Sequence, residues 1–184
     1  MSNTNDELSK VQGQMSLPEK IAAFVPGFRG YKEKEIRRES DKLIRNRLYM
    51  KLSLEKTDLR EIEQKLADRR YFDVLTDMDR LLAKMDRVVE KINHAPEGYS
   101  GFFDAVKVRE DNLDNMIAFD SKLIDGIIAL ATEIDGFKAD LAGGVTTNLK
   151  TRVQNVTDKL ESLENTFDQR NEVIMGVSYD ATGN

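Results

Sequence analysis

Two segments of the chain carry apolar residues at alternating spacings of four and three, which is the repeat of a coiled-coil seam. The first set is Tyr71, Leu75, Met78, Leu82, Met85, Val89 and Ile92. The second set is Leu149, Val153, Val156, Leu160, Leu163 and Phe167. Each set predicts a long amphipathic helix whose apolar face lies against another helix.

Between these two segments the apolar residues follow a wider stripe. Its members are Leu113, Met116, Ile117, Leu123, Ile124, Ile127, Leu130, Ala131, Ile134, Phe137 and Leu141. A stripe of this width can contact two neighbouring helices at once, because it covers more of the helix circumference than a single seam does. The pattern therefore predicts that this segment is the central helix of the fold.

Residues 31–94 contain neither Gly nor Pro, and an unbroken helix of that length would be about 95 Å long. We expect one or two breaks in it. The heptad spacing is lost between Leu66 and Tyr71, which predicts a stutter, a kink or a helix break at that point. Upstream, the sequence LPEKIAAF predicts a short helix with Pro18 in its first turn, ended by Pro26 and Gly27.

Two turn sequences divide the rest of the chain. The stretch HAPEGYSGFF predicts a turn followed by a second long helix, with Ser100 as its N-cap and Leu141 near its end. The stretch AGGVT predicts another turn, after which Thr146 or Thr147 would cap a third long helix that ends at Gly176. Short turns between long helices favour antiparallel neighbours.

These elements predict an all-α protein, an antiparallel three- to four-helix bundle with coiled-coil-like long helices. We expect a disordered N-terminal tail over residues 1–16, a single bundle domain over residues 17–176 and a flexible C-terminal tail over residues 177–184. A length of 184 residues suffices for one core, and the small number of Gly and Pro residues agrees with long helices. Apolar seam that remains after the bundle has formed would support self-association.

Composition and charge narrow the location and the partners. The chain has no cysteine, which excludes disulfides, thiolate metal sites and a cysteine nucleophile and is compatible with a reducing cytoplasm. The first 17 residues lack the apolar core of a secretory signal, and no apolar run approaches the ~20 residues of a spanning helix. We therefore expect a cytoplasmic protein. Its net charge of −5 argues against nonspecific nucleic-acid binding by the whole chain.

No pattern in the chain predicts an enzymatic reaction, because the glycines occur singly or in turns and form no phosphate-binding loop, dinucleotide fingerprint or nucleophile elbow. The one histidine, His94, lies near a predicted helix end, where it would interact with the last carbonyl groups. Glu90 precedes it by four residues, but this pair alone makes no catalytic metal site, and a di-iron bundle needs two histidines. We expect a non-enzymatic protein with no cofactor or metal, and no small-molecule substrate can be named.

Asp120 lies close to the wide apolar stripe, because the steps from Leu113 through Ile117 to Ile124 pass beside it. Two interpretations stay open. Asp120 could be a boundary residue that pairs with Lys or Arg from a neighbouring helix. Alternatively, it could be a buried polar residue that sets the register of the bundle or belongs to a carboxylate-lined ligand or metal site.

Residues 24–52, FVPGFRGYKEKEIRRESDKLIRNRLYMKL, include the most basic part of the chain. Residues 29–51 contain nine basic and four acidic side chains, so the remainder carries a net charge of about −10. On a helix the inward face would consist of Ile36, Ser40, Leu43, Ile44, Leu48 and Met50. Nearly opposite this face lies a stripe without acids, bordered by Glu35 and Asp41, whose members are Tyr31, Lys34, Arg38, Lys42, Arg45 and Tyr49.

Like charges at i,i+4 on this stripe repel one another by roughly 0.2 to 0.5 kcal/mol per pair, so an anionic group is expected to compensate them. Acidic residues of the same protein could do so, and candidates are Asp73, Asp77, Asp86 and Glu90. An anionic membrane could also bind the stripe, with aromatic residues near the Pro-Gly turn as shallow anchors. Nucleic acid is the least favoured, because the surrounding protein is acidic. The residues expected to bind an anionic surface or partner are Phe28, Arg29, Tyr31, Lys34, Arg38, Lys42, Arg45 and Tyr49.

The turn before the basic helix also has a purely structural explanation. The sequence VPGF, residues 25–28, fits a type II turn, in which Pro fixes φ and Gly supplies the positive φ that follows. Gly30 would then be the N-cap of the basic helix, with Glu33 as its N3 acid. The string VPGFRGYKEKEIRRESDKLIR resembles a P-G-aromatic-R-G-Y-K-x-K-E-x-R-R motif in a family of small prokaryotic helical proteins of unassigned function. The resemblance covers residues 24–47 and implies no activity, catalytic residue or cofactor.

Together these features favour a non-enzymatic helical scaffold or protein-interaction module that self-associates or binds another protein. The alternative is peripheral binding to an anionic membrane surface through the aromatic and basic segment 24–49. A carboxylate-lined site near Asp120 is a weaker alternative.

Overall fold

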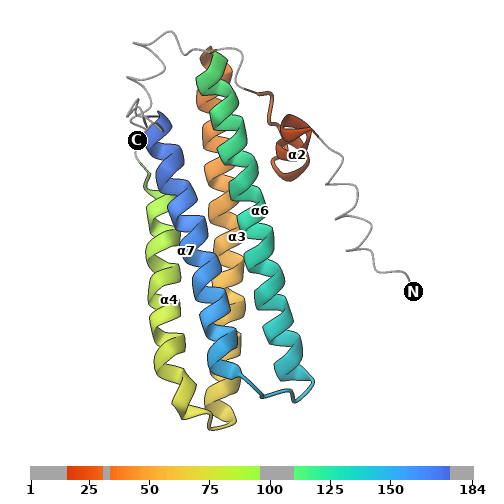
Figure 1. The fold of residues 1–184 in the computed structure, drawn as a ribbon, viewed down its shortest axis with the longest axis vertical. Coiled ribbons are helices and arrows are strands. Elements are labelled where there is room, and N and C mark those ends of the chain that lie inside the picture. The colour runs from red at the N-terminus through yellow and green to blue at the C-terminus, as the bar shows by residue number, and fades with distance from the viewer. Residues whose placement is uncertain (1–15, 31–33, 96–109, 175–184) are drawn as a thin grey trace, which may run out of the picture.

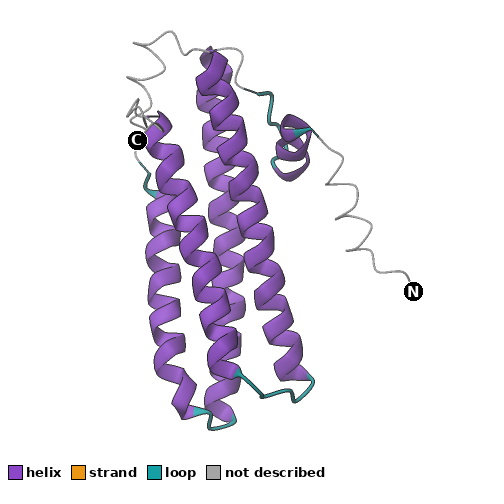
Figure 2. Ribbon diagram, viewed as in Figure 1, coloured by secondary structure: helices purple, strands orange, loops and turns teal. Residues whose placement is uncertain are grey.

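The computed structural model describes residues 16–30, 34–95 and 110–174, and these residues form helices and turns without a strand (Figure 2). The all-α class is therefore confirmed. The helices are α2 (Leu17–Phe24), α3 (Lys34–Asp68), α4 (Phe72–Asn93), α6 (Glu110–Ala142) and α7 (Leu149–Ile174). The expected tails, the N-cap at Ser100 and the helix end at Gly176 lie outside the described residues.

The four long helices form a bundle, and the short helix α2 lies beside it against α6 (Figure 1). Each long helix runs antiparallel to the one that follows it in the chain (Figure 1). The neighbouring pairs are α3 with α4, α6 with α7, α3 with α6, and α4 with α7. The last two pairs are parallel (Figure 1). For α4 and α7 this is seen in two ion pairs: Lys84 pairs with Glu161, and Lys91 pairs with Asp168, two turns later on both helices.

The break between α3 and α4 lies where the heptad spacing is lost. Arg70 adopts a left-handed conformation with φ 63°, which reverses the chain after the last helical turn. The backbone N–H groups of Arg70 and Tyr71 donate to the carbonyls of Ala67 (2.9 Å) and Leu66 (3.0 Å), which is the Schellman arrangement. The predicted interruption is therefore a complete helix break that allows α4 to fold back along α3.

Because Arg70 is not a glycine, its left-handed conformation strains the backbone. We expect Arg70→Gly to raise the free energy of unfolding by about 0.5 to 1 kcal/mol, measured by urea denaturation. The same substitution at exposed Arg60, in the interior of α3, should lower it by about 1 kcal/mol. A loss of stability for Arg70→Gly would show that the arginine side chain matters more there than the backbone conformation does.

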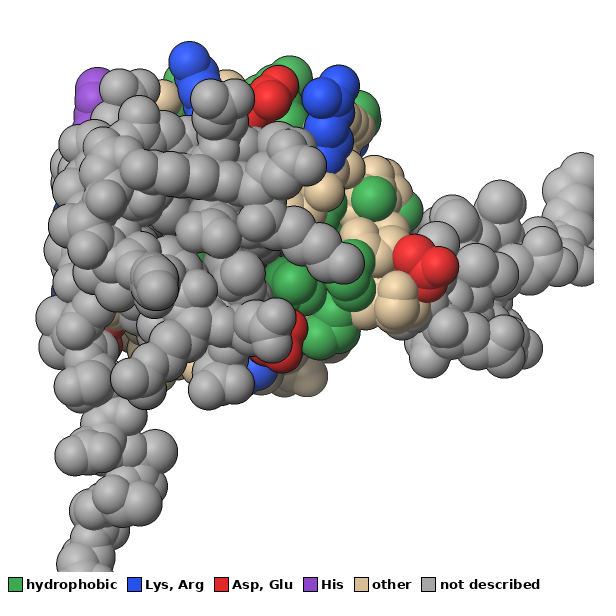
Figure 3. Space-filling model, turned by 90° about the horizontal axis from the view of Figure 1, so that it is seen from above, with side chains coloured by type: hydrophobic (Ala, Val, Ile, Leu, Met, Phe, Trp, Pro, Cys, Tyr) green, Lys and Arg blue, Asp and Glu red, His purple; other side chains and the backbone are tan. Residues whose placement is uncertain are grey.

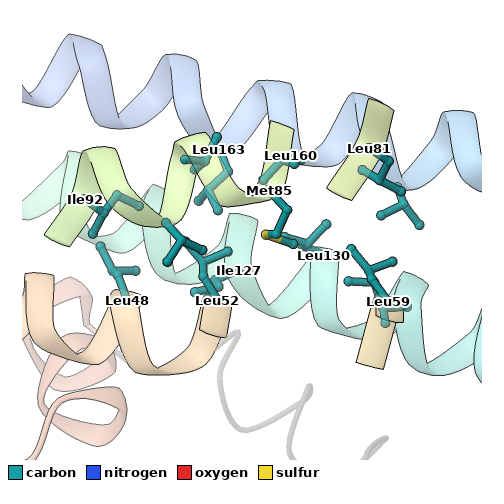
Figure 4. Packing of buried hydrophobic residues seen from close by; sticks show 14 of the residues in the cluster. Leu48, Leu52, Leu59, Leu81, Met85, Ile92, Ile127, Leu130, Leu160 and Leu163 are labelled. Atoms are coloured by element: carbon teal, nitrogen blue, oxygen red, sulfur yellow. The ribbon is translucent and has the colours of Figure 1, made fainter. Parts of the chain in front are cut away.

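The core is formed by apolar side chains from all four long helices, which point toward one another in Figure 4. In α7 the predicted seam is confirmed, since Val153, Val156, Leu160, Leu163 and Phe167 are buried. In α4 the prediction is only partly right. Tyr71, Leu75 and Leu82 are half-buried, whereas the buried residues of this helix are Val74, Met78, Leu81, Met85, Val88, Val89 and Ile92. A helix in a bundle faces two neighbours, so its buried stripe is wider than a two-stranded seam.

Helix α6 contacts the two long helices α3 and α7, as its wide stripe predicted, and also the short α2. It is not central, because each of the four long helices has two long neighbours. At Gly126 of α6, an added Cβ would lie 3.0 Å from Leu163 Cδ1 of α7. The absence of a side chain at this position therefore lets the two helices come close together.

The N-terminal elements follow their local sequence signals. Ser16 and Glu19 form a capping box at the start of α2, with the Ser16 backbone N–H donating to Glu19 Oε2 at 2.9 Å. The predicted turn over residues 25–28 is present, since the Phe28 N–H donates to the Val25 carbonyl at 3.2 Å and Gly27 has φ 88°. Helix α3 is described from Lys34 onward, so the N-cap role of Gly30 depends on residues outside the described part.

The prediction that Thr146 or Thr147 caps the last helix is wrong. Helix α7 begins at Leu149, directly after Asn148, which has φ 60°. Asn tolerates the left-handed conformation better than other residues with a Cβ, and this conformation redirects the chain into the helix. The turn therefore extends one residue beyond Thr147.

Candidate functional site

Of the predicted basic stripe, the structure describes the side chains of Lys42, Arg45 and Tyr49. Arg29 and Lys42 are exposed, whereas Phe28 and Tyr49 are half-buried and lie against the core. Arg45 is also largely buried and bonded within the protein. The side chains of Tyr31, Lys34 and Arg38 lie outside the described residues.

The inward face of α3 is rotated relative to the predicted one. Ser40, Ile44 and Leu48 are buried as expected, but Met50 is 61% exposed and Asp41, expected at the surface, is only 1% exposed. The prediction placed Asp41 at the border of the outward basic stripe. Asp41 is buried instead, because its carboxylate has a partner on another helix.

Arg170 of α7 is wholly buried between two aspartates from other helices. Its Nε donates to Asp120 Oδ1 of α6 at 2.5 Å, and its Nη1 donates to Asp41 Oδ1 of α3 at 2.8 Å. Both aspartates are buried, with exposed fractions of 0% and 1%. One guanidinium therefore joins three helices, because its planar group presents several N–H donors in fixed directions.

Arg45 extends this arrangement to the fourth helix of the bundle. Its Nε donates to Asp41 Oδ2 at 2.9 Å, and its Nη1 donates to the carbonyl of Ala95, just after α4, at 3.0 Å. Asp41, Arg45, Asp120 and Arg170 thus form a charge cluster with two positive and two negative groups. It lies at the end of the bundle drawn uppermost in Figure 1, and Figure 3 looks down on that end.

The charge cluster favours one relative alignment of α3, α6 and α7 along their axes. Each charged group has a partner of opposite sign, so the cluster can remain ionised in a buried position. Any shift of α3, α6 or α7 by one helical turn would leave one of these charges unpaired. Both interpretations of Asp120 are therefore confirmed in part, because it is buried and also pairs with an arginine from a neighbouring helix.

Arg170 was not among the predicted site residues, although a signal was present. It follows Phe167 by three residues and Leu163 by seven, so it occupies the next position of the α7 seam. Asp41 likewise precedes the buried Leu48 by seven residues. Charged residues at seam positions on two helices were the available sign that the helices meet through an ion pair.

Glu55 is a second buried acid of α3 that the predictions missed. It is 4% exposed and also lies at a seam position, seven residues after Leu48 and seven before Ile62. Its Oε2 atom has no hydrogen-bond partner among the described residues. Burial raises the pKa of this carboxyl to about 7, with further contributions from the negative charges of Asp135 and Asp58.

His94 lies at the end of α4, as predicted. It is the C-cap residue, its backbone N–H donates to the Glu90 carbonyl at 2.9 Å, and its Nε2 lies 3.0 Å from Glu90 Oε2. Both side chains are exposed. Among the described residues, no group of three or more His, Cys, Asp or Glu side chains is arranged to hold a metal ion.

Between α4 and α7 lies a groove of about 600 Å³ with a basic lining. Four cationic side chains and two acidic ones line it: Arg80, Lys84, Arg87, Lys150, Asp77 and Glu161. Lys84 pairs with Glu161 and Arg80 with Asp77. The part of the chain that the structure describes offers Arg87 and Lys150 no ion-pair partner, so the groove has two uncompensated positive charges. We call it the basic groove.

The basic groove also has polar and apolar components. Thr151, Gln154 and Asn155 of α7 line it with hydroxyl and amide groups, and the buried Leu81 and Val153 form part of its wall. Its two sides come from neighbouring parallel helices, so its shape follows from their association. Sequence reasoning missed this groove, since it considered the surroundings of the N-terminal basic segment alone.

No protein-family model, no curated protein and no solved structure matches this chain. The resemblance of residues 24–47 to a family motif therefore stays a prediction. In the described residues, no helix is both long enough and apolar enough to span a bilayer.

Proposed function

We propose that the protein is a non-enzymatic helical interaction module whose basic groove binds an acidic helical segment of a partner protein. The observation that supports this function is the uncompensated positive charge of Arg87 and Lys150 in a groove between two helices. Exposed cations beside apolar wall residues suit a helical ligand that offers carboxylates together with small apolar side chains on the same face.

The spacing of the cations supports a helix as the ligand. Arg80, Lys84 and Arg87 stand at i, i+4 and i+7 on α4, so they form one row along the groove. The row covers about 10 Å at 1.5 Å per residue. A helix with carboxylates at the same spacing can approach all three cations at once.

The shape of the groove favours a protein segment over a membrane. A bilayer presents its headgroups as a nearly flat surface. Such a surface can contact the rim of a groove between two helices but not the interior of the groove. The membrane alternative also has fewer groups at its disposal, because Arg45 bonds to Asp41 and Phe28 and Tyr49 lie against the core. A nucleic acid would extend beyond the groove over a chain with a net charge of −5, which repels phosphates.

The proposal is tested with a fluorescent peptide of about three EAAAEAA repeats, which places Glu at spacings of four and three. We expect salt-sensitive binding in fluorescence anisotropy, because the attraction between exposed charges is screened by ions. The double variant Arg87→Glu/Lys150→Glu should weaken binding about tenfold or more, since each substitution replaces an attraction by a repulsion.

The matched control is Arg29→Glu/Lys42→Glu, which changes the net charge equally at two exposed residues of the basic segment. It should leave the affinity nearly unchanged. Equal losses in the two double variants would show that only net charge matters and would refute the groove as the site. Equal binding of a peptide with Lys in place of Glu would show that the carboxylates are not recognised and would also refute the proposal. Flotation with anionic liposomes that only the control variant abolishes would favour the membrane alternative.

Self-association is a separate part of the proposed function. The seam residues of α7 are buried within one chain, so a second copy would have to use other apolar residues. Met50 and Leu54 are suitable, because they are exposed by 61% and 54% and lie one turn apart on α3. Sedimentation over a range of protein concentrations tests whether the chain self-associates. A cytoplasmic location is also part of the proposal.

A further inference from the structure

Glu55 occupies a place in the bundle where an apolar residue is expected. Leu52 and Leu59, one turn before and one turn after it, are buried in the core. The carboxyl is buried with them, and its Oε2 atom has no hydrogen-bond partner in the described part of the chain. An ionised carboxylate without such partners is unfavourable in a buried position, whereas a neutral carboxyl is tolerated much better.

The charges near Glu55 increase this preference for the neutral form. Asp58 of α3 and Asp135 of α6 raise the pKa of Glu55, and Lys51 of α3 and Lys138 of α6 lower it. Burial contributes most to the shift, and the two aspartates come next. The balance therefore opposes a negative charge at this position.

Lys138 is less effective against this charge than its position suggests, because it is engaged elsewhere. Its ammonium pairs with Asp58 and lies 2.7 Å from Glu61 Oε2. Both acids hold the lysine at the rim of the contact between α3 and α6, where they share its positive charge. Glu55 thus shares its nearest cation from α6 with two other carboxylates.

We propose that Glu55 is a proton-binding switch in the contact between α3 and α6. With the proton bound, the neutral carboxyl fits its buried seam position and the two helices stay in contact. When the proton leaves, the carboxylate seeks water, and the contact loosens around Leu52 and Leu59. This property does not depend on the basic groove, which lies between α4 and α7.

Glu63 is another acid of α3 with a raised pKa. Burial and a side-chain hydrogen bond with Asp79 of α4 raise the pKa of Glu63. A hydrogen bond between two carboxyl groups requires one proton, so this contact also retains a proton better in the folded state.

The direction of the pH effect follows from the raised pKa. Between about 4.5 and about 7 the folded protein keeps a proton on Glu55 that the unfolded chain has released. The contribution of Glu55 to the stability of the fold is therefore greatest below the pKa that this residue has in the unfolded chain, and it declines as the pH rises toward 7. Above the folded pKa the loss is complete, and the bundle is at its weakest with respect to this group.

The proton is located directly by NMR titration of the Glu55 side-chain carboxyl carbon in the full chain. We expect a midpoint near pH 7, in contrast to about 4.3 for an ordinary glutamate. Exposed Glu39 on the same helix serves as the internal control. A midpoint for Glu55 between 4 and 5 would overturn the proposal.

The effect on the fold is measured from urea midpoints between pH 5 and pH 8. The wild-type midpoint should fall as the pH rises, whereas Glu55→Gln, an isosteric neutral side chain, should remove most of this dependence. Glu39→Gln should retain it. A pH profile for Glu55→Gln that runs parallel to the wild-type profile would refute the switch even if both proteins fold. If Glu55→Gln does not fold, the NMR midpoint of the wild-type protein decides alone.

Discussion

Replacing Arg170 by Met is expected to lower the free energy of unfolding by about 3 to 5 kcal/mol, which corresponds to a loss of roughly 6 to 20 °C in melting temperature. Met fills most of the space of the arginine stem but has no positive charge. The change leaves Asp41 and Asp120 buried, with their carboxylates deprived of this guanidinium. Asp41 then keeps only Arg45 of the two guanidinium groups, and Asp120 loses the guanidinium of Arg170 in a position without access to water.

The size of this effect separates a buried charge cluster from ordinary surface pairing. The same substitution at exposed Arg80, which lies 3.4 Å from Asp77, should change the stability by less than about 0.5 kcal/mol. A small effect for Arg170→Met, measured by urea denaturation, would mean that the two aspartates find water or take up protons without disrupting the bundle.

A triple variant tests whether the charge cluster specifies register or supplies stability. Replacing Asp41 and Asp120 by Leu together with Arg170→Met removes the three fully buried charges. Arg45 loses Asp41 as a partner but keeps its hydrogen bond to the Ala95 carbonyl and is partly exposed. We expect this variant to recover much of the stability lost in Arg170→Met, because apolar replacements of a buried ion pair are often neutral or stabilising. Its NMR spectrum should show more than one conformation if the charges set the register.

Replacing Phe137 by Ala is the second substitution with a large expected effect, a loss of about 3 to 5 kcal/mol in the free energy of unfolding. Phe137 is wholly buried in α6, whose wide stripe contacts both α3 and α7. Removal of the ring forfeits its burial and leaves a cavity that the helices can close only by moving. Chemical denaturation at fixed pH measures the loss.

Phe72 provides the matched control, because it is the first residue of α4 and is 66% exposed. The same chemical change there should alter stability by less than about 0.5 kcal/mol. If Phe72→Ala were as damaging as Phe137→Ala, the ring of Phe72 would have to be buried by another contact, for example with a second copy of the chain.

Some cationic side chains are bonded inside the protein, whereas others are exposed to solvent. We assign structural roles to the first group and a binding role to the second. Arg45 and Arg170 are bonded inside the protein, as is Arg47, whose Nε donates to the Phe24 carbonyl at 3.1 Å and thereby ties α2 to α3. Arg45 and Arg47 of the N-terminal segment thus help to hold the bundle together. Arg87 and Lys150 are exposed in the basic groove, where a partner can reach them.

The sequence predicted the helices well because their signals are local. The capping box at Ser16, the turn over residues 25–28 and the interruption after Leu66 each depend on residues within a few positions of one another. The repeats of three and four placed the apolar faces of α6 and α7 correctly, since periodicity follows directly from helix geometry. Errors occurred where a charged residue lies in the core, as on α3.

By itself, the sequence determined the helical class, the long amphipathic helices and the breaks between them. The tertiary structure alone decided which faces meet, and hence that Arg170 bonds to Asp120 and to Asp41, 50 and 129 residues away in the chain. It also decided that Glu55 is buried with no partner for its Oε2 among the residues that the structure describes, and that α4 and α7 enclose a basic groove. The physical reason is that the burial and pairing of a charge depend on groups brought together from different helices, whereas helix formation and its periodicity are encoded in neighbouring residues.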